Sequence, residues 1–132
     1  MKTCTIPTKK TVAAFKDYDF ENCDVPEQYQ GDYPHKNFCK KVFMPILRRE
    51  FKKLAEKTHS ELVNFSGGYF IASAYFKRGD KYVYVSIDDV RWNDWYGVVL
   101  YRTAANEKDS RGGANNFCAY DKLEDAINWL LK

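Results

Sequence analysis

The chain has 132 residues and a mass of 15.5 kDa, a size that suits one domain able to bury a core without metals or disulfides. Its net charge of +3 argues against a strongly acidic nucleic-acid mimic and against a uniformly basic nucleic-acid binder. Its aromatic content of 17% is high, and aromatic side chains build cores, protein interfaces and platforms on which nucleic-acid bases stack.

Residue types that ligate metals are few and scattered. They include four cysteines and two histidines: Cys4, Cys23, Cys39, Cys118, His35 and His59. No C-x-x-C pair occurs, so we expect no metal and no cofactor. The opening MKTCTIPTKK is too polar for a signal peptide, and no apolar run approaches the roughly 20 residues of a membrane span. We therefore expect a cytoplasmic protein with reduced thiols and no membrane contact.

Residues 1–35 differ in composition from the rest of the chain. Between Asp17 and Asp32 they carry six acids and no Lys or Arg, and prolines and a glycine break any long element. They also contain too many large apolar side chains for a disordered tail. We predict an irregular acidic and aromatic arm that packs onto a helix–sheet–helix core formed by residues 36–132, all within one domain.

A helical pattern begins at Lys36. We predict a short turn or helix over residues 37–43, followed by a helix that starts at Pro45, because proline is tolerated in a first turn, and that ends near His59. One face of this helix is apolar. It consists of Leu47, Phe51, Leu54 and Thr58, with Ala55 beside them.

The opposite arc of the same helix is basic. It carries Arg48, Arg49, Lys52 and Lys53. Two interpretations stay open at this point. The arc is either the solvated face of an amphipathic helix or a contact surface for phosphates or an acidic protein.

Period-two alternation next predicts a β-hairpin. GGYFIASAYF and KYVYVSIDD flank the turn KRGD, and a two-residue loop of Arg78 and Gly79 would pair Ala74 with Val83. A third strand, WYGVVLYRT, continues the meander, and residues 61–65 form a possible edge strand. The predicted class is therefore α+β, with a three- to four-stranded antiparallel meander, a basic amphipathic helix before it and a C-terminal helix after it.

The register gives the sheet one aliphatic face and one tyrosine face. In the same count, Ala72 pairs with Val85 and Phe70 with Ile87 on the aliphatic face, which we expect both helices to cover. The other face and the adjacent connector gather large aromatic side chains: Tyr69, Tyr75, Tyr82, Tyr84, Trp92 and Trp95. This tyrosine face is either a second small core under the N-terminal arm or a recognition surface.

A long loop, AANEKDSRGGANN, follows the last predicted strand. Its glycines either turn backbone amides toward an anion, with Arg111 adding charge, or supply positive φ angles to a connection. Because unstructured loops of this length are uncommon, we favour a partner contact through Lys108 and Arg111. Asp121, three residues before Glu124, predicts a capping box at the start of the last helix. The core stripe of that helix is Leu123, Ala126, Ile127 and Leu130.

Signs of catalysis are weak. Asp88 and Asp89 end a strand and Asp94 follows, so a Mg²⁺ site can be drawn, but acidic pairs at strand ends are also common turn formers. No nucleophile-elbow, zinc-protease or Walker pattern occurs. We expect no enzymatic activity, and a small metal-dependent nuclease or another enzyme is the third-ranked alternative.

One part of the chain resembles small accessory proteins of Firmicutes phages and conjugative elements. Those proteins carry YVYVSI-x-DVR before LIRTA-xx-EKDYTGG-x-N. This chain has YVYVSIDDVR and LYRTAANEKDSRGGANN, with Ser110 and Arg111 in place of the expected Tyr-Thr. The likeness spans roughly residues 68–131. It implies a mobile element in a bacterial cell, a setting whose small proteins include anti-CRISPR proteins, which usually act by binding.

We therefore expect a non-enzymatic protein that binds and inhibits a bacterial defence nuclease, such as a CRISPR effector, by occluding a protein or nucleic-acid-binding surface. The aromatic face and the Lys108–Arg111 loop would contact that partner. The alternative is a DNA- or RNA-binding accessory protein of a mobile element, which would use the basic arc of the helix. The sequence leaves the oligomeric state open.

Overall fold

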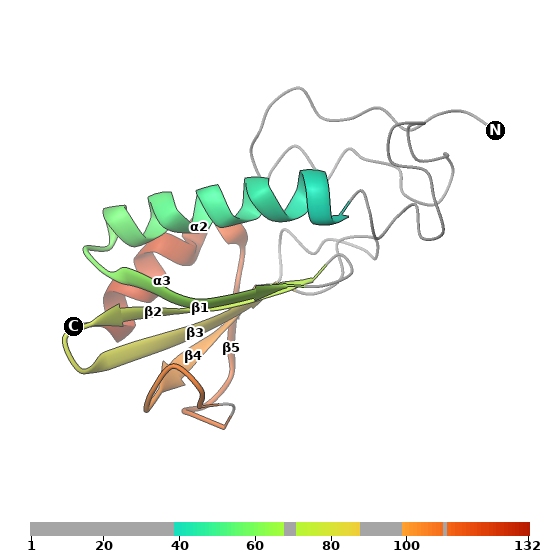
Figure 1. Ribbon diagram of the computed structural model, residues 1–132. Coiled ribbons are helices and arrows are strands. Elements are labelled where there is room, and N and C mark those ends of the chain that lie inside the picture. Colours follow the sequence, from blue (N-terminus) through green and yellow to red (C-terminus); the bar gives the residue numbers. More distant parts are fainter. Residues whose placement is uncertain (1–38, 68–70, 88–98, 110) are drawn as a thin grey trace.

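The computed structural model describes residues 39–67, 71–87, 99–109 and 111–132. In chain order they form η3 (Cys39–Phe43), α2 (Met44–Lys57), β1 (Glu61–Gly67), β2 (Ala72–Arg78), β3 (Lys81–Ile87), β4 (Val99–Ala104), β5 (Asn116–Cys118), η5 (Tyr120–Lys122) and α3 (Leu123–Leu130). Figure 1 shows α2 and α3 on one side of an antiparallel sheet. The α+β class is confirmed.

Helix α2 begins and ends close to the predicted positions. Proline occupies its first turn, and the π-helical turn η3 precedes it. At its end His59 has a φ of 50°, and its N–H donates to the Glu56 carbonyl at 3.2 Å. The Ser60 N–H donates to the Ala55 carbonyl at 2.9 Å. These two bonds form a Schellman motif, which satisfies carbonyls that the helix end would otherwise leave without partners.

The described strands form one five-stranded sheet in the order β1-β2-β3-β4-β5, every neighbouring pair antiparallel. The meander and the strand before it are confirmed. The prediction of three or four strands missed β5, which pairs through only three residues and is too short to show a period-two pattern. Strand β1 carries an irregularity between Val63 and Ser66, where Asn64 has a φ of 50°.

The predicted hairpin register was wrong by one residue on each strand. The loop consists of Gly79 and Asp80, so Arg78 pairs with Lys81 and Ala74 pairs with Val85, not Val83. Ile87 likewise pairs with Ala72 instead of Phe70, and Val85 no longer pairs with Ala72. Gly79 has a φ of 61°, which glycine adopts without strain, and this places it first in the loop. Because the side chains alternate with period two, the error leaves the two predicted faces unchanged.

The core lies between the helices and the aliphatic face of the sheet. Its fully buried members include Phe43, Leu47 and Phe51 from the helical side and Phe76, Val83, Val85 and Ile87 from the sheet. Helix α2 lies over β1 and β2, and α3 lies over β4 (Figure 1). The predicted stripe of α2 is buried throughout, including Thr58, whose hydroxyl donates to the Leu54 carbonyl at 2.9 Å.

The start of α3 differs from the prediction. Asp121 lies inside the 3-10 turn η5, and the residue before α3 is Lys122, which makes no side-chain capping bond. The predicted capping box is therefore wrong, because the 3-10 turn continues directly into the helix and leaves Asp121 no cap position. The predicted stripe does face the core through Leu123 and Ile127, both fully buried.

Arg78 joins the ends of both helices to the sheet. From the end of β2, its Nη2 donates to the Thr58 carbonyl at the end of α2 and to the Asn128 Oδ1 of α3 at 3.0 Å. Its Nη1 donates to the Leu131 carbonyl at the end of α3 at 3.4 Å. A cation at a helix C-terminus also interacts favourably with the helix dipole. We call these contacts the Arg78 clamp.

Replacing Arg78 with Ala should lower the free energy of unfolding by about 2 kcal/mol, because two helix-end carbonyls lose a charged donor. Urea unfolding followed by circular dichroism measures this. Lys81→Ala is the matched control, since Lys81 pairs with Arg78 in the hairpin and its side chain is exposed. Equal unfolding midpoints for the two variants would contradict the clamp.

Candidate binding surfaces

The four basic residues predicted opposite the core of α2 are all exposed: Arg48, Arg49, Lys52 and Lys53. Leu47 and Phe51, on the other side of the same helix, are fully buried. Between Cys39 and Lys57 the chain carries seven Lys or Arg and two Glu, a net charge of +5, while the whole chain carries +3. The remaining residues therefore sum to −2. We call the four exposed cations the basic face of α2.

The two flanks of the basic face have different surroundings. On the β1 side, the Arg48 guanidinium lies 5.0 Å from the centre of the Phe65 ring, a cation–π contact. On the α3 side, Lys53 and Lys57 border a pocket between the two helices.

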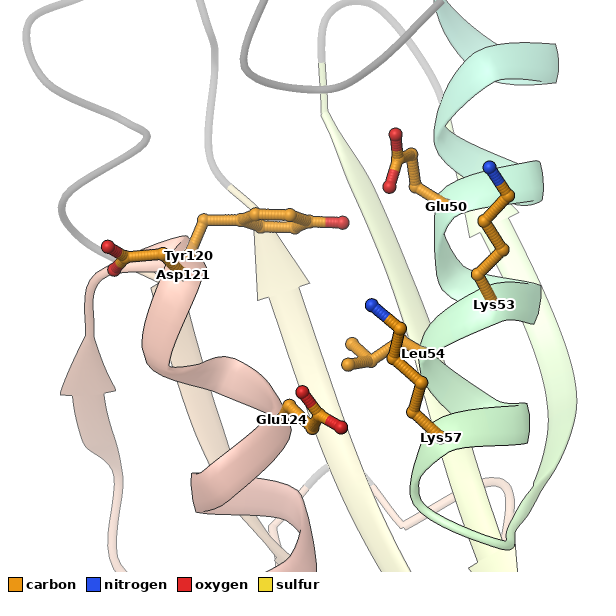
Figure 2. Close-up of a pocket in the computed structure, with 7 residues that line it drawn as sticks. All are labelled: Glu50, Lys53, Leu54, Lys57, Tyr120, Asp121 and Glu124. Atoms are coloured by element: carbon orange, nitrogen blue, oxygen red, sulfur yellow. The ribbon is translucent and has the colours of Figure 1, made fainter.

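The pocket between α2 and α3 has a volume of about 180 Å³. It is lined by Glu50, Lys53, Leu54, Lys57, Tyr120, Asp121 and Glu124. Figure 2 shows the Tyr120 ring extending from the α3 side toward α2, with Glu124 and Lys57 directed into the space between the helices. Two lysines and three carboxylates share the lining, so the positive charge on this flank of α2 is offset.

The second candidate surface is formed by the loop that covers the tyrosine face. Residues 105–109 and 111–115, which we call the strap, follow β4 and lie on the side of the sheet away from the helices (Figure 1). The Asn64 Nδ2 of β1 donates to the Glu107 carbonyl at 2.7 Å. The Tyr75 hydroxyl of β2 and the Arg102 Nη2 of β4 both donate to the Asp109 carbonyl, at 3.0 and 3.1 Å.

An arginine and two tyrosines form a compact cluster beneath the strap. The Arg102 guanidinium lies 4.3 Å from the centre of the Tyr84 ring, and the ring centres of Tyr75 and Tyr84 are 5.0 Å apart. Arg102 is 5% exposed and Tyr75 is 6% exposed. Burial, followed by the nearby Tyr84, raises the pKa of the Tyr75 hydroxyl, which therefore stays a proton donor at neutral pH.

The strap has its own internal hydrogen bonds. The Asp109 carboxylate accepts from the Ala105 N–H at 2.8 Å and from the Arg111 N–H at 2.9 Å. These two bonds hold the pKa of the Asp109 carboxyl below its usual range. The Asn106 Oδ1 accepts from the Lys108 N–H at 2.8 Å, a further local turn contact.

The paired glycines allow the strap to approach β4. The Gly113 N–H donates to the Thr103 carbonyl at 2.9 Å. A Cβ at Gly112 would overlap the same carbonyl and lie 2.6 Å from the Arg102 Nη1. Neither glycine has a positive φ, so the expectation that they supply that backbone angle was wrong. Their structural role is close backbone approach.

The structure separates the predicted site residues into two groups. Lys108 and Arg111 are exposed on the strap, Tyr75 is buried beneath it, and Tyr82 and Tyr84 are half-buried. The basic face of α2 lies on the other side of the sheet from this group. Tyr69, Trp92 and Trp95 lie outside the described residues, as do Asp88, Asp89 and Asp94.

The sequence did not predict the contact between Arg102 of β4 and Asp109 of the strap. Strand periodicity does place Arg102 on the tyrosine face, because it pairs with Tyr84. An arginine at a strand position that faces aromatic side chains is the signal that could have identified it. The contribution of Asp109 is a backbone carbonyl, and no residue pattern specifies that.

Two kinds of chemistry, metal binding and nucleophilic attack by a thiol, bear on the described residues. Within those ranges, no group of three His, Cys, Asp or Glu side chains could hold a metal ion. Burial, followed by the charge of Asp121, raises the pKa of the Cys118 thiol, so the thiol stays protonated at neutral pH and is a poor nucleophile.

No helix in the described part of the chain is long and apolar enough to cross a membrane.

Comparisons of the chain with protein-family models, with curated proteins and with solved structures gave no match.

Replacing Gly112 with Ala should displace the strap, since the new Cβ would overlap the Thr103 carbonyl. We expect a loss of about 1 to 3 kcal/mol in the free energy of unfolding, typical of overpacking, measured by urea unfolding. Ala114→Gly is the control, because Ala114 is exposed on the same strap. A wild-type midpoint for Gly112→Ala would show that the strap does not need its close contact with β4.

The strap should also respond to acid. Since folding lowers the pKa of Asp109, its contribution to stability is complete above the unfolded-state pKa of about 4 and is lost as the pH falls through the lower folded-state value. Wild type should therefore melt at a higher temperature than Asp109→Asn near pH 6, and the difference should shrink below about pH 4. Thermal unfolding across this range measures it, and a difference independent of pH would contradict the role of the carboxylate.

Proposed function

We propose that the protein acts by binding and that its target is a bacterial defence nuclease, such as a CRISPR effector, which it inhibits by covering a functional surface. The observation that carries this proposal is the exposed basic face of α2, which lies opposite the core and gathers four positive charges on one helix of a chain whose net charge is +3. The resemblance of residues 68–131 to small mobile-element proteins supports the choice of target class.

The basic face suits this role because it can be used without rearranging the fold. Its side chains are exposed, and the apolar side of the same helix is anchored in the core by Leu47 and Phe51. A rigid helix that presents cations complements the negative potential of a nuclease complex loaded with nucleic acid, and such complementarity speeds association.

The strap offers a second contact region. Lys108 and Arg111 are exposed there, and the strap's hydrogen bonds to Tyr75 and Arg102 hold its backbone on the sheet. Tyr75 itself is 6% exposed, so its role in this arrangement is to support the strap. In the proposed complex α2 makes the main electrostatic contact, and the strap is a smaller, separate contact on the other face.

The test is inhibition of target cleavage. The purified chain is titrated into cleavage reactions of a panel of CRISPR effectors and other bacterial defence nucleases. Replacing Arg48, Arg49, Lys52 and Lys53 together with Gln should weaken inhibition roughly 10- to 100-fold, because the variant loses several exposed charge contacts of modest strength each. Gln replacements of the exposed Lys81, Lys122 and Lys132 serve as the control and should change it little.

Two outcomes would contradict the proposal. Inhibition that persists in the four-fold variant at wild-type potency would remove α2 from the contact. A chain that inhibits none of the nucleases in the panel, while remaining folded by circular dichroism, would contradict the function itself.

A further inference from the structure

We infer that the anionic ligand of α2 is the phosphate backbone of duplex DNA, and that the contact uses Arg48, Arg49 and Lys52 and leaves out Lys53 and Lys57. This inference rests on the proposed role of α2 as the contact surface and specifies what that surface touches. It divides the basic face according to the charges that surround each side chain.

The division follows from helical geometry and from the pocket. Glu50, Lys53 and Lys57 recur at intervals of three and four residues, which places them on one flank of α2. That flank faces Asp121 and Glu124 across the pocket (Figure 2). A phosphate brought to Lys53 or Lys57 would therefore also approach three carboxylates. The repulsion between like charges offsets the attraction of the two ammonium groups.

Among the described residues, the other flank of α2 has fewer acids around it. Arg48 and Lys52 are four residues apart and share the flank above β1, with Arg49 beside them on the outer surface. Glu56 is the one acid of α2 near these three, four residues after Lys52. Within the part of the chain that the structure describes, the positive charge on α2 that neighbouring acids do not offset is therefore centred on Arg48, Arg49 and Lys52.

Arg48 is positioned before any ligand arrives. Its guanidinium lies over the half-buried Phe65 ring at 5.0 Å, which restricts the side chain and leaves its planar donors available. A pre-ordered guanidinium loses less conformational entropy on binding, and its fork of donors matches a phosphate.

The chemistry of the α2 surface favours a polyanion over a protein surface. Protein interfaces are centred on apolar and aromatic anchors. The large exposed apolar side chains of the described residues are Ile71, Phe117 and Trp129, and α2 contributes none of them. Binders of single strands add aromatic platforms to their cations, and α2 exposes no aromatic residue. The backbone of a duplex needs only the cations.

The experiment measures binding of the full chain to a mixed-sequence DNA duplex of about 20 base pairs by fluorescence anisotropy, between about 50 and 200 mM salt. With three phosphates neutralised, the logarithm of the association constant should fall against the logarithm of salt concentration with a slope of roughly −3. A single strand of the same length is the second probe, and the duplex should bind more tightly.

Two double variants provide a matched comparison, since each removes two positive charges four residues apart on α2. Arg48→Gln with Lys52→Gln should make the slope shallower by about 2, whereas Lys53→Gln with Lys57→Gln should change it by less than about 0.5. Glu56→Gln should tighten binding, because it removes the acid beside Lys52. Circular dichroism melting curves establish that each variant is folded.

Three results would overturn the inference: no duplex binding at the lowest salt, equal slopes in the two double variants, or tighter binding of the single strand. Failure of the inference and failure of the proposed function are distinguishable. If the chain inhibits a nuclease but does not bind duplex DNA, the proposed function stands and the inferred DNA contact is wrong. If the chain binds duplex DNA as described but inhibits no nuclease, the inferred DNA contact stands and the proposed function is wrong.

Discussion

The guanidinium of Arg78 is the point at which three elements of the fold meet. It leaves the sheet at the end of β2 and bonds the last carbonyls of α2 and α3. These bonds hold the C-terminal ends of both helices against the sheet, while the burial of Leu47 and Phe51 fixes the rotation of α2 about its axis. That rotation decides which of its residues meet the core and which meet solvent. The surface of α2 that we propose for binding therefore depends on the packing of the helix against the core and on the Arg78 contact at its C-terminal end.

The two faces of the sheet are covered in different ways. The aliphatic face is buried by helices through Phe76, Val83 and Val85, as in many α+β domains. The tyrosine face is covered by the strap, and the Tyr75 hydroxyl and the Arg102 Nη2 both donate to the backbone carbonyl of Asp109 in the strap. Antiparallel sheets often leave one face to water, but here the strap shields Tyr75 and Arg102 from it. Candidate contacts consequently lie on the outer surfaces of α2 and the strap.

Much of this arrangement could be predicted from local patterns. The stripe through Leu47 and Phe51 identified α2 and its exposed face, and strand alternation assigned residues to the correct sides of the sheet. The hairpin register failed because KRGD permits more than one two-residue loop, and the choice depends on where Gly79 takes its positive φ. The prediction missed strand β5 because three residues are too few to show period-two alternation.

The strap was beyond sequence reasoning for a different reason. Its contacts join residues far apart in the chain, such as Tyr75 with the carbonyl of Asp109, and a carbonyl is present at every position. The composition of the loop showed that it contains turns, but not that it folds back across four strands. The pocket likewise depends on the distance between two helices, which their separate patterns do not specify.

The irregularity at Asn64 also bears on whether the sheet can pair edge to edge with other molecules. A sheet border with a regular row of free amides and carbonyls recruits strands from other molecules and leads to aggregation. In the described sheet, one border is β1, whose register shifts at Asn64, and the other is β5, which pairs over three residues. Neither border gives an incoming strand a long, even ladder to extend. The same Asn64 that anchors the strap thus helps to keep the sheet from growing sideways.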